Sequence, residues 1–452
     1  MRMVGIWAWT ATAACLTLGA SSAAAGSTDL DCGPIATAEQ RALEVQVKAV
    51  LASAPMQREQ ARIVALYRAD PQAGSPAGRA TIERAAAAIA NAAAQYIVND
   101  PANAQPMWVT KAPLRLRGVA VGRSGYGIDN PDNVYRNVPI DAAASYEITG
   151  RIGPGGPAQL HFTLMDAVPG TTPMSVEGGG FVGTLSSEDM EIGPDGRFTV
   201  TIGPEPANGR SNHIQSKGSG KLLMVVRDLF TDWGKQQPAA LAVRKTGGPD
   251  LIAPTPAELA RRSAALLAKI APYWLAYDNT YLYSRPANAF VAPRLRPGGR
   301  GISASGWFSL QDGEALVVTL DPLGAKSLGF QLTDPWGVAY DYIDRTSSLN
   351  LAQARPNPDG TITYVIAARD PGAANWLDPS GQGGGIMTIR WQGLPGGVTP
   401  AQAVREVRKV SLPLPADIAT VSPAERRLQQ KERAATYWRR TFGPAPVAAC
   451  KG

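Results

Sequence analysis

Aromatic side chains that suit a ligand-binding wall are concentrated in residues 272–290, PYWLAYDNTYLYSRPANAF. Three of them, Tyr277, Tyr281 and Tyr283, are separated by even numbers of residues, so they lie on one side if the segment is extended. Packing alone would favour Leu and Phe, because a buried tyrosine hydroxyl needs a hydrogen-bond partner. We therefore expect these rings to line a pocket between two domains, with simple interdomain packing as the alternative.

A second aromatic pair, Trp336 and Tyr340 in DPWGVAYDY (334–342), is expected at the same cleft. Clefts between domains are common places for small-molecule sites. Tyrosine hydroxyls on an apolar wall suit a saccharide, a polyol or a flat apolar molecule. The sequence thus predicts a small uncharged or weakly acidic ligand.

A third group of polar and aromatic residues lies near the C-terminal end: Asn375, Trp376, Asp378 and Arg390. An amide, an indole and a guanidinium together suit a planar or hydroxylated ligand, through stacking and forked hydrogen bonds. The alternative is a structural lock, in which Asn375 bonds the backbone, Trp376 plugs a sandwich, and Arg390 pairs with Asp378 or Asp359. We favour the lock, because an asparagine and an arginine recur with the same spacing elsewhere in the chain, as a requirement of the fold would produce.

Two residues are candidates for acid–base chemistry, His213 on a loop and Tyr283 in the aromatic segment. A histidine near neutral pH can act as a general base. The alternative for His213 is that it fills a packing position which Trp376 holds elsewhere. His161 is expected in the middle of a strand, on the face opposite its apolar neighbours, and a structural role is favoured for it over a pocket-lining one.

The sequence contains no GxSxG, Walker A, HExxH or CxxC motif, and the glycine-rich stretches at 298–301 and 381–385 do not open helices. The chain has three cysteines and two histidines, too few for a Cys/His zinc site once export removes Cys15. We therefore expect neither a metal nor a cofactor.

An internal duplication explains why part of the lock recurs. LHFTLMD at 160–166 matches LGFQLTD at 328–334 at every second position, which is the period of a strand. A PDG turn follows in each copy and leads a β-rich run. The distance from a loop asparagine to a strand arginine is 15 residues both times, Asn212 to Arg227 and Asn375 to Arg390.

Helices follow each of the two copies. TPAE at 255–258 and SPAE at 422–425 are capping boxes with proline at the first helical position. Between them, short runs of β-formers broken by Gly and Pro predict antiparallel sheets. The expected fold class is mainly β with helical additions: two tandem antiparallel β-sandwich or jelly-roll domains, an N-terminal helical arm, and a helix after each β domain.

These patterns divide the chain into a signal peptide (1–25), a helical N-terminal region (26–105), a first β-sandwich (106–254), a linking helix (255–275), a second β-sandwich (276–415), and a C-terminal helix with a tail (416–452). The N-terminal helices can pack within the chain or bind a second copy of the protein. Packing within the chain is favoured over association with a second copy of the protein.

The first 25 residues carry Arg2, a long apolar run and small residues before a cleavage site near Ala25, which predicts export to the periplasm or the medium. No later segment is apolar enough to predict a transmembrane helix. Export leaves two thiols in an oxidising compartment, so Cys32 and Cys450 are expected to form a disulfide. The net charge is +7, but the basic residues are scattered, which argues against nucleic acid as a partner.

Residues 326–391 resemble the family catalogued as domain of unknown function 1214, through LGFQLTDPWG, NPDGTITYVI, DPGAANWLD and IMTIRWQG. The first copy is similar but more divergent, with Asn212 and His213 where the pattern has Asn-Trp. The resemblance implies β-sandwich or jelly-roll modules in an exported bacterial protein. It implies no settled activity.

The sequence therefore supports two functions. The favoured one is an exported protein that binds a small molecule in an aromatic cleft between duplicated sandwiches. The alternative is a metal-independent hydrolase or lyase acting on a carbohydrate or related substrate, with Tyr and His as acid and base and an arginine steadying a carboxylate.

Overall fold

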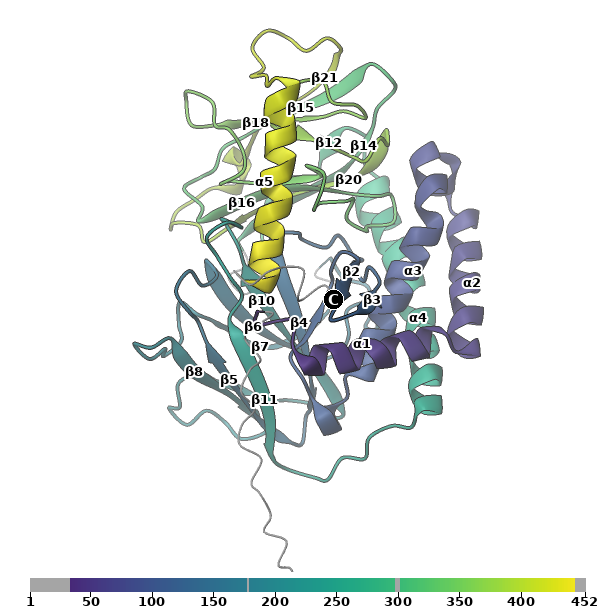
Figure 1. The fold of residues 1–452 in the computed structure, drawn as a ribbon, viewed down its shortest axis with the longest axis vertical. Coiled ribbons are helices and arrows are strands. Elements are labelled where there is room, and N and C mark those ends of the chain that lie inside the picture. Colours follow the sequence, from purple (N-terminus) through teal and green to yellow (C-terminus); the bar gives the residue numbers. More distant parts are fainter. Residues whose placement is uncertain (1–32, 177–178, 297–300, 444–452) are drawn as a thin grey trace, which may run out of the picture.

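The computed structural model describes residues 33–176, 179–296 and 301–443 (Figure 1). Two β-sandwiches lie one above the other in this view, with helices α1 to α4 on one side. Helix α5 runs along the upper sandwich and ends at the lower one. The expected fold class, mainly β with helical additions, is confirmed.

The first sandwich pairs a five-stranded sheet, β1-β4-β10-β6-β7, with a four-stranded sheet, β11-β5-β8-β9. Leu160, Phe162 and Leu164 alternate along β6 and are fully buried in the core between the sheets. The strands are β1 (Met107–Val109), β4 (Asn133–Asp141), β5 (Ser145–Arg151), β6 (Gln159–Met165), β7 (Phe181–Ser186), β8 (Arg197–Gly203), β9 (His213–Gln215), β10 (Lys221–Leu229) and β11 (Ala240–Gly247), and a hairpin, β2 (Leu114–Leu116) with β3 (Val119–Val121), precedes β4.

The second sandwich repeats this order strand by strand. Its sheets run β12-β14-β20-β16-β17, with β13 also on β14, and β19-β18-β15-β21, so β14 to β21 correspond to β4 to β11. Even the parallel pair recurs, as β8 with β9 and β18 with β19. The strands are β12 (Ala289–Phe290), β13 (Arg294–Leu295), β14 (Ile302–Ser309), β15 (Glu314–Leu320), β16 (Ser327–Thr333), β17 (Ser348–Asn350), β18 (Ile362–Ile366), β19 (Trp376–Leu377), β20 (Gly384–Gln392) and β21 (Val404–Ser411).

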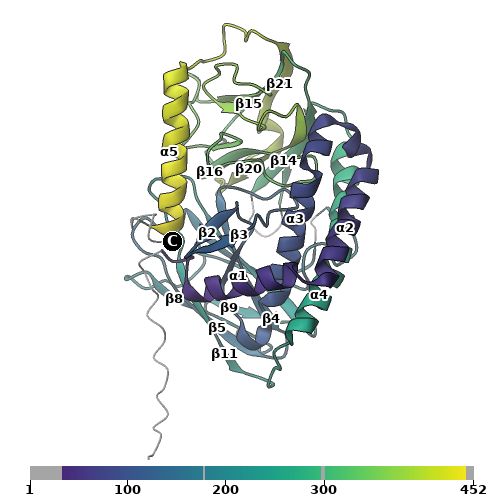
Figure 2. The same cartoon turned by 45° about the vertical axis from the view of Figure 1, so that its right-hand side comes forward.

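Four helices, α1 (Ala38–Leu51), α2 (Ala54–Ala69), α3 (Pro76–Val98) and α4 (Pro256–Asp278), pack together beside the sandwiches (Figure 2). Their shared core includes Ile63, Ile89 and Ile270. The N-terminal helices thus pack within the chain, while association with a second copy stays a prediction. Short 3₁₀ turns span Pro71–Gly74, Pro101–Asn103 and Pro400–Gln402, and a π-helical turn, Asn279–Tyr283, extends α4.

Both predicted capping boxes are present, at Thr255 for α4 and at Ser422 for α5 (Pro423–Phe442). Helix α5 lies along the second sandwich in Figures 1 and 2, and its C-terminal end reaches the first. It carries an arginine at every seventh position, Arg426, Arg433 and Arg440. Arg426 pairs with Asp370 of the second sandwich at 2.9 Å. Arg440 donates to the carbonyl of Pro131, just before β4 of the first sandwich, at 2.9 Å. The helix therefore fastens the two sandwiches to each other.

The predicted signal peptide, residues 1–25, and the predicted disulfide partners, Cys32 and Cys450, lie outside the described residues. Gly33 lies close to the backbone of Phe442, so the two ends of the described part of the chain meet. None of the helices that the structure describes has the length and apolar character of a membrane span.

Candidate functional site

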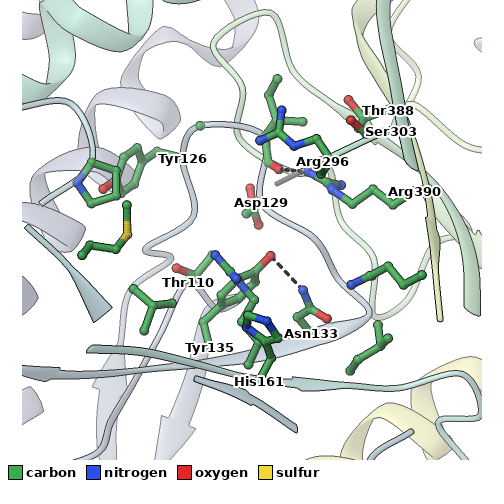
Figure 3. A pocket seen from close by; sticks show the side chains of 18 of the residues that line it. Thr110, Tyr126, Asp129, Asn133, Tyr135, His161, Arg296, Ser303, Thr388 and Arg390 are labelled. Carbon is green, nitrogen blue, oxygen red and sulfur yellow. Dashed lines mark hydrogen bonds between the residues drawn. The ribbon is translucent and has the colours of Figure 1, made fainter. Parts of the chain in front are cut away.

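A cavity of about 270 Å³ lies between the two sandwiches (Figure 3). Side chains from β4, β6 and β10 form one wall, and side chains from β14 and β20 form the other. These are the sheet faces that point away from the two sandwich cores. The end of α4 and residues 126–129 close the remaining sides.

The first wall is built around Arg227 on β10. Strand pairing puts Arg227 beside Tyr135 on β4 and His161 on β6, so all three point out of the core and into the cavity. The guanidinium lies 5.9 Å from the Tyr135 ring centre. His161 is 7% exposed, and its Nδ1 is 3.1 Å from the Thr163 hydroxyl. Asn133 donates to the Tyr135 hydroxyl at 3.0 Å.

The second wall is built in the same way around Arg390 on β20. Arg390 is paired with Ser303 on β14, and Thr388 is paired with Ser305, with 3.2 Å between their hydroxyl oxygens. Arg390 donates to the Ile128 carbonyl at 2.7 Å. This wall is therefore lined by hydroxyl groups, whereas the first carries an imidazole and a phenol.

Arg227 and Arg390 occupy equivalent places in the duplicated fold. Each is the seventh residue of a nine-residue strand, and β10 and β20 correspond in the two sandwiches. Among the described residues neither guanidinium forms an ion pair. Burial lowers the pKa of both, and the charge of Arg227 lowers the pKa of Arg390 further. Both remain cations at any physiological pH.

Asp129 is the carboxyl group of the described cavity lining. It is 6% exposed, and its Oδ1 accepts from the Ala339 backbone N–H at 2.9 Å. Burial raises the pKa of Asp129 from 3.8 to about 6, although the Ala339 hydrogen bond and the charge of Arg123 oppose the rise. The group therefore changes charge in a range that cells experience.

Two lining residues have strained backbone. Thr110 has φ +54° and Ile128 has φ +64°, although both are β-branched and β-branched side chains rarely adopt this region. The conformation at Ile128 belongs to the turn that presents its carbonyl to Arg390. Strain of this kind is concentrated at functional sites, because it persists only where the surrounding structure enforces it.

Three polar atoms in the lining lack a hydrogen-bond partner within the described structure: Asn133 Oδ1, Asn137 Nδ2 and Trp274 Nε1. Most buried polar atoms in proteins are paired. A polar ligand could satisfy this acceptor and these two donors.

Only two of the residues predicted to bind a ligand line this cavity, Tyr277 and Arg390. The expectation that Tyr277, Tyr281 and Tyr283 share one side of an extended segment is wrong, because α4 and its π-helical turn continue to Tyr283. On a helix, residues four apart are neighbours, and the rings of Tyr277 and Tyr281 are 4.8 Å apart. Tyr283 points elsewhere and donates to the Pro335 carbonyl at 2.8 Å.

Trp336 and Tyr340 are also absent from the described cavity lining. Trp336 stacks on Tyr67 at 4.7 Å and donates to the Gly78 carbonyl at 3.1 Å, so it anchors the N-terminal helices. Tyr340 donates to the Gly384 carbonyl at 2.7 Å. Both rings are packing residues, which is the alternative that the sequence had left open.

The proposed lock is correct for its asparagine and tryptophan and wrong for its arginine. Asn375 Oδ1 accepts from the Arg355 backbone N–H at 2.7 Å and its Nδ2 donates back to the Arg355 carbonyl at 2.8 Å. Asn212 makes the same two bonds with Glu191 in the first sandwich. Trp376 is 5% exposed and donates to the Ala367 carbonyl.

Arg390 does not take part in that lock. Asp378 is paired with Arg345 at 2.9 Å, and Asp359 bonds Thr361 in its own turn. The strand alternation that buries Ile389 and Trp391 in the core turns Arg390 outward, to the cavity.

His213, the candidate base, lies outside the described lining of the cavity. Its Nδ1 is 2.7 Å from the Thr201 hydroxyl, and its Nε2 is 2.8 Å from the Glu205 carbonyl. It pairs with Thr201 on β8 as Trp376 pairs with Val365 on β18. The histidine therefore holds the packing position of the tryptophan, and neither it nor Tyr283 reaches the cavity.

No family model and no curated protein matches the chain. Among solved structures, an uncharacterised protein from Burkholderia cenocepacia is 26% identical, with a TM-score of 0.62, over 79% of this chain and 95% of its own. A protein from Vibrio parahaemolyticus is 11% identical over 63% of this chain and 90% of its own, with a TM-score of 0.39, too low to support an argument. The duplicated architecture is thus similar to that of the Burkholderia protein.

Proposed function

We propose that this protein binds a small organic acid in the cavity between its two sandwiches. The observation that carries the proposal is that Arg227 and Arg390, equivalent residues of the two repeats, line one cavity and have no ion-pair partner among the described residues. A half-buried cation without a counter-charge is costly, and a carboxylate accepting forked hydrogen bonds from arginine offsets that cost.

The size and lining of the cavity narrow the ligand. A volume of about 270 Å³ lies below the roughly 300–1,000 Å³ of pockets for drug-sized molecules, so the ligand is small. Tyr135, Trp274 and Tyr277 supply rings, and Ser303 and Thr388 supply hydroxyls. The sequence predicts a ligand that is saccharide-like or flat and apolar, and either uncharged or weakly acidic. This lining favours the acidic ligands, such as a sugar acid or an aromatic acid.

The proposal also includes where the protein acts in the cell. The apolar, small-residue character of residues 1–25 supports export to the periplasm or the medium. Fractionation of the expressing bacteria, followed by N-terminal sequencing of the mature chain, tests it. A chain that retains Arg2 in the cytosol would overturn this part of the proposal.

Titration calorimetry with matched ligands tests the binding function. Galactose and galacturonate differ by one carboxylate, as do benzyl alcohol and benzoate. A hydrogen bond to a charged group contributes about 1.5–3 kcal/mol, so an acid should bind roughly 10–150-fold more tightly than its neutral counterpart. Arg390→Gln or Arg227→Gln should remove that advantage, whereas Arg369→Gln, at a side chain 85% exposed, should not. Equal affinity for acid and neutral ligand would overturn the proposal.

The second candidate function is the hydrolase or lyase. One observation favours it: Asp129 lines the same cavity as His161, Arg227 and Arg390, and burial raises the pKa of its carboxyl to about 6. A carboxyl with that pKa can exchange protons near neutral pH. Appearance of an unsaturated product from oligogalacturonate, abolished in Asp129→Asn and in His161→Gln, would favour the lyase over simple binding.

A further inference from the structure

We propose that the natural ligand carries two acidic groups and that each sandwich holds one of them, so that the ligand is a small dicarboxylate. This inference rests on the proposed function and deepens it. Its basis is that Arg227 and Arg390, equivalent residues of the two repeats, extend into the cavity from opposite walls. A third arginine, Arg296, also lines the cavity and follows β13 of the second sandwich.

The two arginines extend from opposite walls, because β10 and β20 belong to different sandwiches. Figure 3 shows His161, Tyr135 and Asn133 on one side of the cavity and Ser303, Thr388 and Arg390 on the other. The charge of Arg227 still lowers the pKa of Arg390, so the two cations lie within electrostatic reach. A ligand spanning the cavity therefore meets a guanidinium at each end.

Each arginine is accompanied by polar side chains that can form hydrogen bonds. Arg390 is in register with Ser303, whose hydroxyl lines the cavity near the Ser305 and Thr388 pair. A carboxylate has about four lone-pair sites and one guanidinium occupies two of them, which leaves sites for such hydroxyls.

The opposite end is arranged in the same way. Arg227 is in register with Tyr135 and His161. The phenol and the imidazole lie beside this arginine, and Asn133 donates to the phenol oxygen at 3.0 Å. Two separate sets, each an arginine with polar side chains beside it, suit two carboxylates better than one.

The charge in the cavity supports the same conclusion. Asp129 makes its described hydrogen bond to the Ala339 backbone, and it forms no ion pair with Arg227 or Arg390 in the described structure. One bound carboxylate would leave either Arg227 or Arg390 without an ion-pair partner. Two carboxylates give each of these arginines a partner and reduce the repulsion between them.

The experiment compares galactose, galacturonate and galactarate, which share a carbon skeleton and carry none, one and two carboxylates. Benzoate and isophthalate form a second pair with a flat ring. Affinities are measured by titration calorimetry on the full chain. We expect galactarate or isophthalate to bind at least 10-fold more tightly than its monoacid.

The variants then assign the two ends. Arg227→Gln and Arg390→Gln should each reduce the affinity for the diacid to that of the monoacid, and the double variant should bind neither. Arg227→Lys and Arg390→Lys keep the charge but lose the forked geometry, so they should restore part of the affinity. Melting temperatures within a few degrees of wild type would show that the variants are folded.

The outcomes separate this inference from the function on which it rests. If monoacid and diacid bind equally while both exceed the neutral sugar, the dicarboxylate inference fails and the organic-acid function stands. If the diacid depends on a single arginine, the inference fails in the same way. If no acid binds better than its neutral counterpart, both fail.

Discussion

The Asp129 carboxyl should make the stability of this protein fall as pH rises through the mildly acidic range, and Asp129→Asn should abolish that part of the fall. The side chain is 6% exposed, and its Oδ1 accepts from Ala339. Asparagine has nearly the same shape and keeps an oxygen for that bond. The substitution therefore removes the ionisation with little change in packing.

The sign and size follow from the pKa. The carboxyl ionises with a pKa of 3.8 ordinarily and of about 6 in the folded protein. Below pH 3.8 both states hold the proton, and the contribution of the group is fully present. As pH rises through about 6, the folded state loses the advantage of holding a proton that the unfolded chain has already released. At about 1.4 kcal/mol for each tenfold difference in proton affinity, the total loss is about 3 kcal/mol.

Urea denaturation of wild type and Asp129→Asn at pH 4, 5, 6, 7 and 8 measures this directly. The two proteins should be similar near pH 4, and the variant should be more stable at pH 8 by about 3 kcal/mol. Asp334, whose charge also raises the pKa of Asp129, is present in both proteins, so the difference reports Asp129 together with its coupling to Asp334. A difference that does not change with pH, or a variant that is less stable at pH 8, would refute the reasoning.

Three further predictions concern stability. Asn375→Ala should lower the free energy of unfolding by about 1–3 kcal/mol, through the lost backbone bonds, and should leave galacturonate affinity within about twofold. Lys111→Met should lower the free energy of unfolding, measured by urea denaturation, by about 3–5 kcal/mol. It removes the ion-pair partner of Glu44, and the two side chains are only 1% and 2% exposed. Adding Glu44→Leu should recover part of the loss. Cys32 and Cys450 should form a disulfide that contributes about 5 kcal/mol in the chain-entropy model, and intact mass after alkylation without reductant should find neither thiol free.

The duplication, the sandwiches and the capped helices were predictable because each leaves a local pattern. Alternating apolar residues such as Leu160 and Phe162 specify a strand face, and Thr255 with Glu258 specifies a helix start. These signals depend on residues a few positions apart, so no tertiary information is needed to interpret them.

The cavity was less predictable because it depends on which strands become neighbours. Arg227 and His161 are far apart in sequence and meet only through the β6–β10 register. The repeated 15-residue spacing did mark both arginines, and strand alternation could have placed each opposite the core. The prediction that residues 276–284 are extended was wrong for a different reason. Their alternation of aromatic and small residues suits a strand, but α4 continues past Pro272 to Asp278.

The meeting of equivalent residues across the cavity has a consequence for how the site can evolve. An interface in which the same position of two copies faces itself is the kind found in two-fold symmetric dimers. Joining the copies in one chain lets each half mutate alone, and the two halves have diverged beside the arginines. Where the first half carries His161 and Tyr135, the second carries Gly329 and Ser303, respectively. A fused pair can therefore recognise a molecule with two different ends, which a dimer of identical subunits cannot do at a shared axis.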